Sequence, residues 1–145
     1  MTHQDLVQAA VQQLKRWKCL PICAEMHCAN TYGEIPDAIG WTARASILIE
    51  CKTSKADFMR DREKIFRKYP DFGMGDIRFF FTPPGVIQEA IMLPPYWGLY
   101  EVVDGRPCHR FGLRYSNACQ IPFQGNKREE LYLMRSYIRR QEKHS

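Results

Sequence analysis

The chain has 145 residues, with 21 Lys and Arg against 16 Asp and Glu, and a formal net charge of +5 at pH 7. A domain of this length buries roughly 68 to 70 per cent of its unfolded surface, so one hydrophobic core suffices without disulfide or metal cross-links. A hydrophobic fraction of 45% and an aromatic fraction of 12% are typical of a globular protein and argue against a disordered or repetitive one. The positive charge modestly favours a polyanionic partner.

The amino-terminal residues lack the basic start and the continuous apolar stretch of a signal peptide. The most hydrophobic window, residues 79–100, is interrupted by prolines and by Gln88 and Glu89, which argues against a membrane span. We therefore expect a cytoplasmic protein with no membrane association. Its 6 cysteines are then expected to be reduced thiols.

The first half of the chain predicts a helix followed by three short strands. Apolar residues at helical spacing from Asp5 to Trp17 predict an amphipathic helix that covers one face of a sheet. Residues 22–27, 35–41 and 46–52 predict strands joined by turns at 30–33 and 42–45. A hairpin meander is the simplest connection between them.

A second helix is predicted after the third strand. Ser54 and Asp57 have the spacing of a capping box, in which each side chain bonds the backbone amide of the other. The helix is expected to run to about Tyr69 and to end at Pro70. Its buried residues are expected to be Phe58, Ile65, Phe66 and Tyr69.

The second half of the chain adds strands and a last helix. Residues 76–82 predict a buried strand, parallel to strand 46–52 because a helical crossover joins the two. A short turn of helix near 86–91 precedes a strand over 97–103, and Asp104-Gly105 indicates a hairpin that returns over 106–113. A helix from about Asn126 to Gln141 closes the chain. We expect one domain over 1–145, with a core at about 5–105 and an added hairpin strand and helix at 106–145.

Two charged residues mark the end of the predicted strand 46–52. Because side chains alternate along a strand, Glu50 and Lys52 share one face, roughly 6 to 7 Å apart. Asp37 stands at the edge of the preceding apolar segment. An acid on one strand, followed by Glu-x-Lys on the next, is the pattern of a metal-dependent nuclease.

The chemistry of these residues suits a divalent cation. Two carboxylates about 4 Å apart repel each other by roughly 4 kcal/mol at an effective dielectric of 20, and a cation between them reverses that repulsion. Asp37, Glu50 and the backbone carbonyl of Cys51 offer oxygen ligands, which Mg²⁺ and Mn²⁺ prefer. Such a metal lowers the pKa of its water and neutralises charge on a phosphodiester. Lys52 would then lie beside the attacking water or the phosphate.

Asp37 followed by Glu50-x-Lys52 resembles the signature of the PD-(D/E)xK nuclease superfamily, and a closer likeness is to its MmcB-like branch of bacterial DNA-repair proteins. In that branch the motif is followed by Ser-x-x-Asp-Phe-x-x-Asp-x-x-Lys, an aromatic strand and a proline. The matching residues here are Ser54, Asp57, Phe58, Asp61 and Lys64, followed by Asp76, Phe79 to Phe81 and Pro83. The likeness spans roughly Leu6 to Gly105.

The resemblance implies an α/β protein with a restriction-endonuclease-like αβββαβ core, in which helices flank a mixed central sheet. It also implies a Mg²⁺- or Mn²⁺-dependent endo- or exodeoxyribonuclease acting in DNA repair, recombination or the processing of phage or mobile-element DNA. Asp37 and Glu50 would hold the metal, and Asp37, Glu50 and Lys52 would form the catalytic set. Glu25 occupies the place of an additional Glu found in many members and would complete the ligands.

Each of these residues also has a structural interpretation. Glu50 and Lys52 could form an exposed ion pair worth less than about 1 kcal/mol. Asp37 could be a turn residue after Pro36, and Glu25 an ordinary polar residue. Asp57 is expected to be mainly a helix cap, and Asp61 a surface or supporting residue.

The cysteines suggest a competing zinc site at Cys19, Cys23, His27 and Cys28. The spacing fits poorly, because no distant second pair follows and adjacent strand residues point in opposite directions. Cys51, Cys108 and Cys119 are scattered.

Basic residues on the middle and last helices could contact nucleic acid. Candidate phosphate contacts are Lys55, Arg135, Arg139 and Arg140, although a solvated helix face would have the same composition. Phosphate contacts carry no sequence information and would serve DNA or RNA. The alternatives to a nuclease are a catalytically silent nucleic-acid-binding module of the same fold, working with a protein partner in a repair or replication complex, and a zinc-stabilised structural protein. The oligomeric state stays open.

Overall fold

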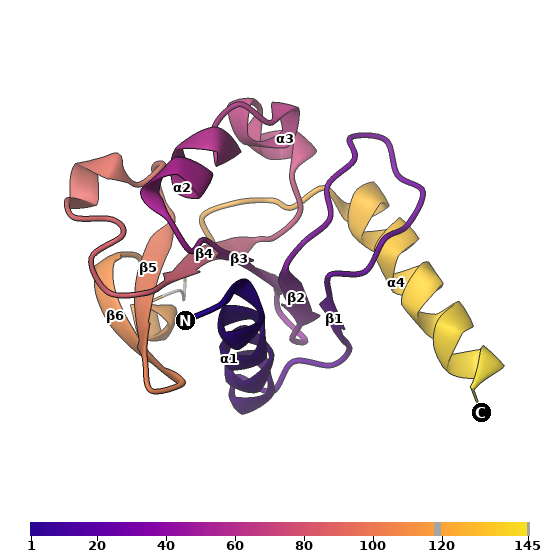
Figure 1. The fold of residues 1–145 in the computed structure, drawn as a ribbon. Coiled ribbons are helices and arrows are strands. Elements are labelled where there is room, and N and C mark those ends of the chain that lie inside the picture. The colour runs from indigo at the N-terminus through magenta and orange to yellow at the C-terminus, as the bar shows by residue number, and fades with distance from the viewer. Residues whose placement is uncertain (118–119, 145) are drawn as a thin grey trace.

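The fold is built around a mixed β-sheet (Figure 1). It is described from a computed structural model that covers residues 1–117 and 120–144. Within these residues the sheet is 6-stranded, with the order β1-β2-β3-β4-β5-β6. Its strands are β1 (Ile22–Ala24), β2 (Ala38–Trp41), β3 (Ser46–Cys51), β4 (Ile77–Thr82), β5 (Gly98–Val103) and β6 (Arg106–Gly112). The α-helices are α1 (His3–Arg16), α2 (Lys55–Asp61), α3 (Ile65–Lys68) and α4 (Lys127–Lys143), with short 3₁₀ turns at η1 (Pro70–Phe72), η2 (Ala90–Met92) and η3 (Tyr115–Asn117).

The strand directions follow from the connections. β1, β2 and β3 pair antiparallel in chain order, as the meander predicts. β3 and β4 are parallel, which confirms the crossover prediction, and β5 is parallel to β4. β5 and β6 form the predicted hairpin, with positive φ angles at Asp104 and Gly105 that suit a tight hairpin turn.

Helices cover both faces of the sheet (Figure 1). Ile47 and Ile49 of β3 belong to one apolar cluster together with Leu6 and Leu14 of α1. The alternate residue Leu48 belongs to a second cluster, which includes Phe58 of α2 and Leu133 of α4. Every residue of β3 and β4 is buried as a result, as expected for central strands that are covered on both faces.

The predicted middle helix is interrupted. Lys64 has an extended backbone, and residues 62–64 separate α2 from α3. Phe58 and Phe66 are buried as predicted, but Ile65 and Tyr69 are 46% and 57% exposed, so their predicted burial is wrong. The break changes which side of the segment faces the sheet, because a continuous helical repeat no longer relates the residues before and after it.

Two other local predictions differ from the structure. Ser54 caps α2 by accepting from the Asp57 amide, but the Asp57 carboxylate accepts from the Thr53 hydroxyl at 3.1 Å and pairs with Arg60, instead of completing a capping box. The complete capping box is at α1, between Thr2 and Asp5. The turn of helix predicted near 86–91 is limited to η2.

The first two strands are shorter than predicted, so a long loop replaces their outer ends. β1 ends at Ala24 and β2 begins at Ala38, which leaves residues 25–37 as a loop. It starts at Glu25, which has a φ of 49° and donates its amide to the carbonyls of Pro36 and Asp37. This loop carries Asp37 to the candidate site and has Glu25 at its other end.

The helices and strands of the second half confirm the remaining element predictions. Asn126 accepts from the Glu129 amide and caps α4, close to the predicted start of the last helix. None of the helices in the described part of the chain is long and apolar enough to cross a membrane.

Candidate functional site

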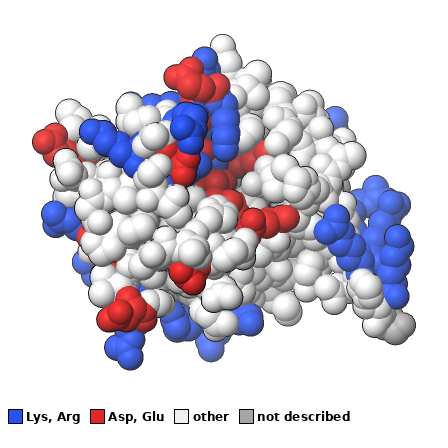
Figure 2. Space-filling view, viewed as in Figure 1, with Lys and Arg blue, Asp and Glu red and all other residues white. Residues whose placement is uncertain are grey.

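A pocket of about 250 Å³ brings Asp37, Glu50 and Lys52 together. Asp37 directly precedes β2, while Glu50 and Lys52 lie at the end of β3. The antiparallel pairing of Ala38 with Ile49 places these two chain ends side by side. The other lining residues are His3, Ile35, Cys51, Asp57, Arg60 and Lys64. Figure 2 shows acidic side chains in a recess of the upper part of the molecule, with Lys and Arg side chains above it.

Asp37 is held by backbone and side-chain contacts. Its Oδ2 accepts a hydrogen bond from the Cys51 amide at 2.7 Å, and its Oδ1 lies 3.4 Å from Nε2 of His3. Because the N–H and C=O of one strand residue point to the same side, the Cys51 carbonyl also faces the β2 side, where Asp37 lies. The local geometry therefore groups a carboxylate and a backbone oxygen.

Glu50 is buried and paired. Its Oε1 lies 3.0 Å from the Arg67 guanidinium, and its side chain is 5% exposed. Burial raises the pKa of the Glu50 carboxyl well above its usual range, and the negative charge of Asp37 raises it further, while Arg67 opposes the shift. The two carboxylates therefore repel each other across the pocket.

Lys52 is also buried, with its Nζ 3.0 Å from Oδ1 of Asp61. Glu50 and Lys52 are consequently not the exposed ion pair of the structural interpretation, since each has a different buried partner. Asp61 is only 3% exposed, so its expected place on the surface is wrong, although it does support the site through Lys52. Burial acts to raise the pKa of Asp61, but Arg67 and Lys52 hold it below its usual range.

Arg67 is the centre of a buried charge network that sequence reasoning missed. Its guanidinium bonds Glu34 at 3.1 Å, Glu50 at 3.0 Å and Asp61 at 2.9 Å, and it lies over the rings of Phe66 and Trp97. Arg67 is one of the basic residues of the predicted middle helix, but the break before α3 turns it inward, toward these carboxylates. These pairings come from four separate segments, so no local spacing indicates them.

His3 was also missed as a pocket residue. It lies between two acids, 3.4 Å from Asp37 and 3.7 Å from Oε2 of Glu25. Glu25 itself accepts from Gln4 at 2.8 Å and lies outside the set of residues that line the pocket. Glu25 is therefore engaged by His3 and Gln4 of the first turn of α1.

The donor set suits a cation held by two carboxylates. Among the described residues no three His, Cys, Asp or Glu side chains are grouped to hold a metal, so Glu25 does not complete a cluster with Asp37 and Glu50. Mg²⁺ usually binds through one or two carboxylates and takes waters and substrate phosphates for its other positions. Asp37, Glu50 and the Cys51 carbonyl fit that requirement.

The cysteines do not form the competing zinc site in the described residues. Burial raises the pKa of Cys19 to about 11 and that of Cys23 to about 12, which disfavours the thiolate that zinc requires. Cys28, Cys51 and Cys108 are free thiols, and Cys119 lies outside the described residues.

The predicted phosphate contacts fall in two places. Lys55 is exposed at the start of α2. Arg135 and Arg139 line a groove beside α4, and Arg140 donates to the carbonyl of His27 at 2.9 Å. Figure 2 shows the dense basic surface over α4 at the right of the molecule, away from the acidic recess.

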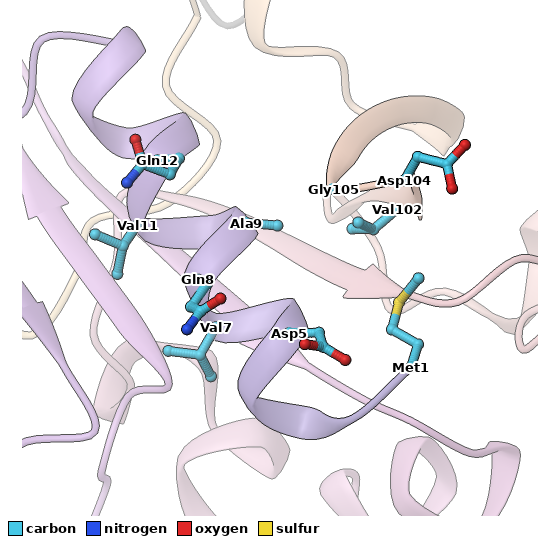
Figure 3. A pocket seen from close by; sticks show the side chains of 10 residues that line it. All are labelled: Met1, Asp5, Val7, Gln8, Ala9, Val11, Gln12, Val102, Asp104 and Gly105. Atoms are coloured by element: carbon cyan, nitrogen blue, oxygen red, sulfur yellow. The ribbon is translucent and has the colours of Figure 1, made fainter.

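A larger pocket, of about 720 Å³, lies between α1 and the turn of the β5–β6 hairpin. Figure 3 shows Ala9 of α1 pointing toward the side of the pocket that Val102 and the hairpin turn form. Its acidic residues are Asp5, which belongs to the α1 capping box, and Asp104, which belongs to the hairpin turn. This pocket therefore offers apolar surface rather than a set of catalytic groups.

Comparison with known proteins supports the fold. No family model and no curated protein matches the chain. A solved structure, the SPO1766 protein of unknown function from Silicibacter pomeroyi, superposes with a TM-score of 0.65 at 21% sequence identity, over 97% of this chain and 89% of that chain. The likeness extends over nearly the whole chain, including the part after residue 105, and it concerns the fold alone.

Proposed function

We propose that this protein is a Mg²⁺- or Mn²⁺-dependent nuclease of the PD-(D/E)xK type, with a restriction-endonuclease-like core, that hydrolyses DNA phosphodiester bonds. The observation that carries the proposal is the common pocket of Asp37, Glu50 and Lys52. Two carboxylates that repel each other, beside a lysine, form a site whose charge a divalent cation and a phosphate would balance.

Each residue has a part in this chemistry. Asp37, Glu50 and the Cys51 carbonyl would hold the cation, which when bound lowers the pKa of its water and neutralises charge on the phosphodiester. The Cys51 amide fixes the Asp37 carboxylate, and Arg67 fixes Glu50. Lys52 bonds Asp61 with one of its three N–H donors, so other donors remain for a phosphate oxygen or a water.

Cleavage assays with conservative variants test the proposal. Glu50→Gln keeps an oxygen that can accept from Arg67, and Asp37→Asn keeps one for the Cys51 amide, so both changes remove charge while preserving shape. We expect the wild type to cut single-stranded, duplex or flapped DNA with Mg²⁺ or Mn²⁺ and not with EDTA. Each variant should lose at least about 100-fold in rate, the scale of electrostatic groups in active sites.

A matched control separates the site from general charge effects. Glu63→Gln removes one carboxylate from a side chain that is 78% exposed, outside the pocket, and should leave cleavage unchanged. Undiminished cutting by Glu50→Gln would contradict the assignment of the site. A wild type that binds DNA but cuts no substrate with either metal would contradict the nuclease itself.

The alternative is a catalytically silent nucleic-acid-binding module of the same fold, acting with a protein partner in a repair or replication complex. One observation favours it: Glu50 and Lys52 are both engaged by internal partners, Arg67 and Asp61. This alternative predicts salt-sensitive binding to DNA or RNA that is unchanged in Asp37→Asn and Glu50→Gln, without metal-dependent cutting.

A further inference from the structure

A groove of about 480 Å³ runs between α4 and the loop of residues 25–37. The helix contributes Tyr132, Arg135, Ser136 and Arg139 to its lining, and the loop contributes Ala29 to Thr31. Among the residues that the structure describes, none of those that line the groove is acidic. The groove thus combines an aromatic ring, hydroxyl and amide groups, and positive charge.

The loop wall of the groove is fixed to α4 at two points. Oε1 of Glu129 accepts from the amides of Thr31 at 2.7 Å and Tyr32 at 2.9 Å. Arg140 donates to the carbonyl of His27 at 2.9 Å. Because these bonds lie on either side of Ala29 and Asn30, the groove is formed before any ligand arrives.

The groove has two arginines without internal partners. Arg135 and Arg139 are four residues apart on α4 and therefore lie on one helix face. Both are exposed, and in residues 1–117 and 120–144 neither guanidinium has a hydrogen bond or an ion pair. Arg67 and Arg140, in contrast, are engaged by the protein itself. These two guanidiniums can therefore bind phosphates without first breaking an ion pair within the protein.

One loop connects the groove with the acidic pocket. Ala29, Asn30 and Thr31 line the groove, while Ile35 and Asp37 of the same loop line the pocket that holds Glu50 and Lys52. The loop therefore joins residues of the groove wall to residues of the acidic pocket.

We propose that the groove binds a single strand of nucleic acid, with phosphates at Arg135 and Arg139 and a base against the ring of Tyr132. A basic groove with an aromatic side chain is the usual means of holding single strands. The recess favours a narrow chain over a flat membrane surface, and the aromatic ring favours a base over an acidic peptide. The inference rests on the proposed function only in taking the bound strand to be the substrate of the acidic pocket.

Binding measured in EDTA tests the groove apart from cleavage. The probe is a fluorescently labelled oligodeoxythymidine, followed by anisotropy over a salt series with the full chain. Arg135→Ala/Arg139→Ala should weaken binding at least about tenfold and reduce the slope of log K against log salt by about 1.4, which corresponds to two phosphate contacts on a single strand. Tyr132→Leu should weaken binding at least about fivefold, and Tyr132→Phe should retain it.

The control is Lys15→Ala/Arg16→Ala, which removes the same charge from exposed positions at the end of α1 and should have little effect. Melting temperatures of all variants check that each is folded. Wild-type binding by the arginine variant, or an equal loss in the control, would overturn the proposal. Stronger competition by duplex DNA, by poly-glutamate or by phosphatidylserine vesicles than by the unlabelled single strand would overturn it in favour of those ligands.

The groove and the nuclease fail in different ways. If binding depends on Arg135 and Arg139 but the protein cleaves no substrate, the nuclease proposal would be refuted, while the groove proposal would stand. Metal-dependent cleavage by a protein whose DNA binding is unchanged in the arginine variant would refute the groove proposal, while the nuclease proposal would stand.

Discussion

At the scale of single residues, Arg67 determines the state of the candidate site. It is paired with Glu34, Glu50 and Asp61, and Asp61 is paired in turn with Lys52. Glu50 in β3 and Lys52 directly after it are therefore both oriented by partners from other segments. An intact buried ion pair contributes little net stability, but removing one partner is costly because a charge is left buried and unpaired. The importance of the network is therefore measured by removing one of its members.

Replacing Arg67 by Met should lower the free energy of unfolding by about 3–5 kcal/mol, because three buried carboxylates would lose their shared cation. Urea denaturation of the wild type and Arg67→Met measures the difference. Arg16→Met, at an exposed position of α1, is the matched control and should change stability by less than about 0.5 kcal/mol. Equal stability of the two variants would mean that the network does not hold the site together.

The pH dependence of stability should report on Glu34. Burial raises the pKa of its carboxyl from the usual 4.5, and Arg67 only partly opposes this. The folded state then binds the proton more tightly than the unfolded state, so the unfolding free energy should fall as the pH rises above about 4.5. The variant Glu34→Gln has no titratable group at this position and serves as the reference.

We therefore expect the stability of the wild type relative to Glu34→Gln to decrease between pH 4.5 and the raised pKa, in urea titrations over a pH series. The comparison cancels the groups that titrate equally in both proteins. A difference that is constant, or that moves in favour of the wild type as the pH rises, would contradict the direction of the shift.

At the scale of elements, α4 is attached to the rest of the protein in two ways. Leu133 packs in an apolar cluster, and the Glu130 carboxylate accepts several hydrogen bonds. Oε1 of Glu130 accepts from the indole of Trp41 at 3.0 Å, and Oε2 accepts from Ser46 and from the Gly75 amide, both at 2.9 Å. The carboxylate is 3% exposed. The groove beside α4 depends on this attachment.

Glu130→Ala should destabilise the protein by at least about 3 kcal/mol, because it leaves several buried donors without an acceptor and each costs about 1–3 kcal/mol. Hydrogen exchange should show a greater loss of protection in α4 than in α1. Leu131→Ala, on the same helix but 54% exposed, is the control. Uniform loss of protection over the whole chain would mean that α4 is not an independently opening unit.

At the scale of the whole molecule, the acidic recess and the basic surface over α4 lie in different places. The acidic recess lies at the end of β3, whereas the excess of basic side chains lies over α4 (Figure 2). A net charge of +5 is compatible with an acidic recess because these surfaces are separate. Such an arrangement would attract a polyanion to one region and concentrate cations at the other.

A cation bound at the pocket should stabilise the fold by mass action. Metal at ten times its dissociation constant adds about 1.4 kcal/mol, which for a protein of this size corresponds to about 3–6 °C in melting temperature. We expect Mg²⁺ or Mn²⁺ to produce such a shift in the wild type and EDTA to reverse it. Asp37→Asn should show no shift; a similar shift in both proteins would indicate metal binding elsewhere.

The features that the sequence predicted correctly depend on neighbouring residues. The buried strands β3 and β4, the parallel crossover between them, the turn at Asp104-Gly105 and the start of α4 near Asn126 each follow from the order and spacing of residues along the chain. The proximity of Asp37 to Glu50 also follows, because a short antiparallel connection joins their strands.

Contacts between distant segments determine which charges are buried and which partners they have. Arg67 meets Glu34, Glu50 and Asp61 across 33, 17 and 6 positions of the chain, and Glu129 meets Thr31 across 98. The break at 62–64, the approach of His3 to Asp37 and the closing of the groove depend on such contacts. Sequence periodicity describes which face of an element is apolar, but it does not contain the distances between elements, and these are set by the packing of the common core.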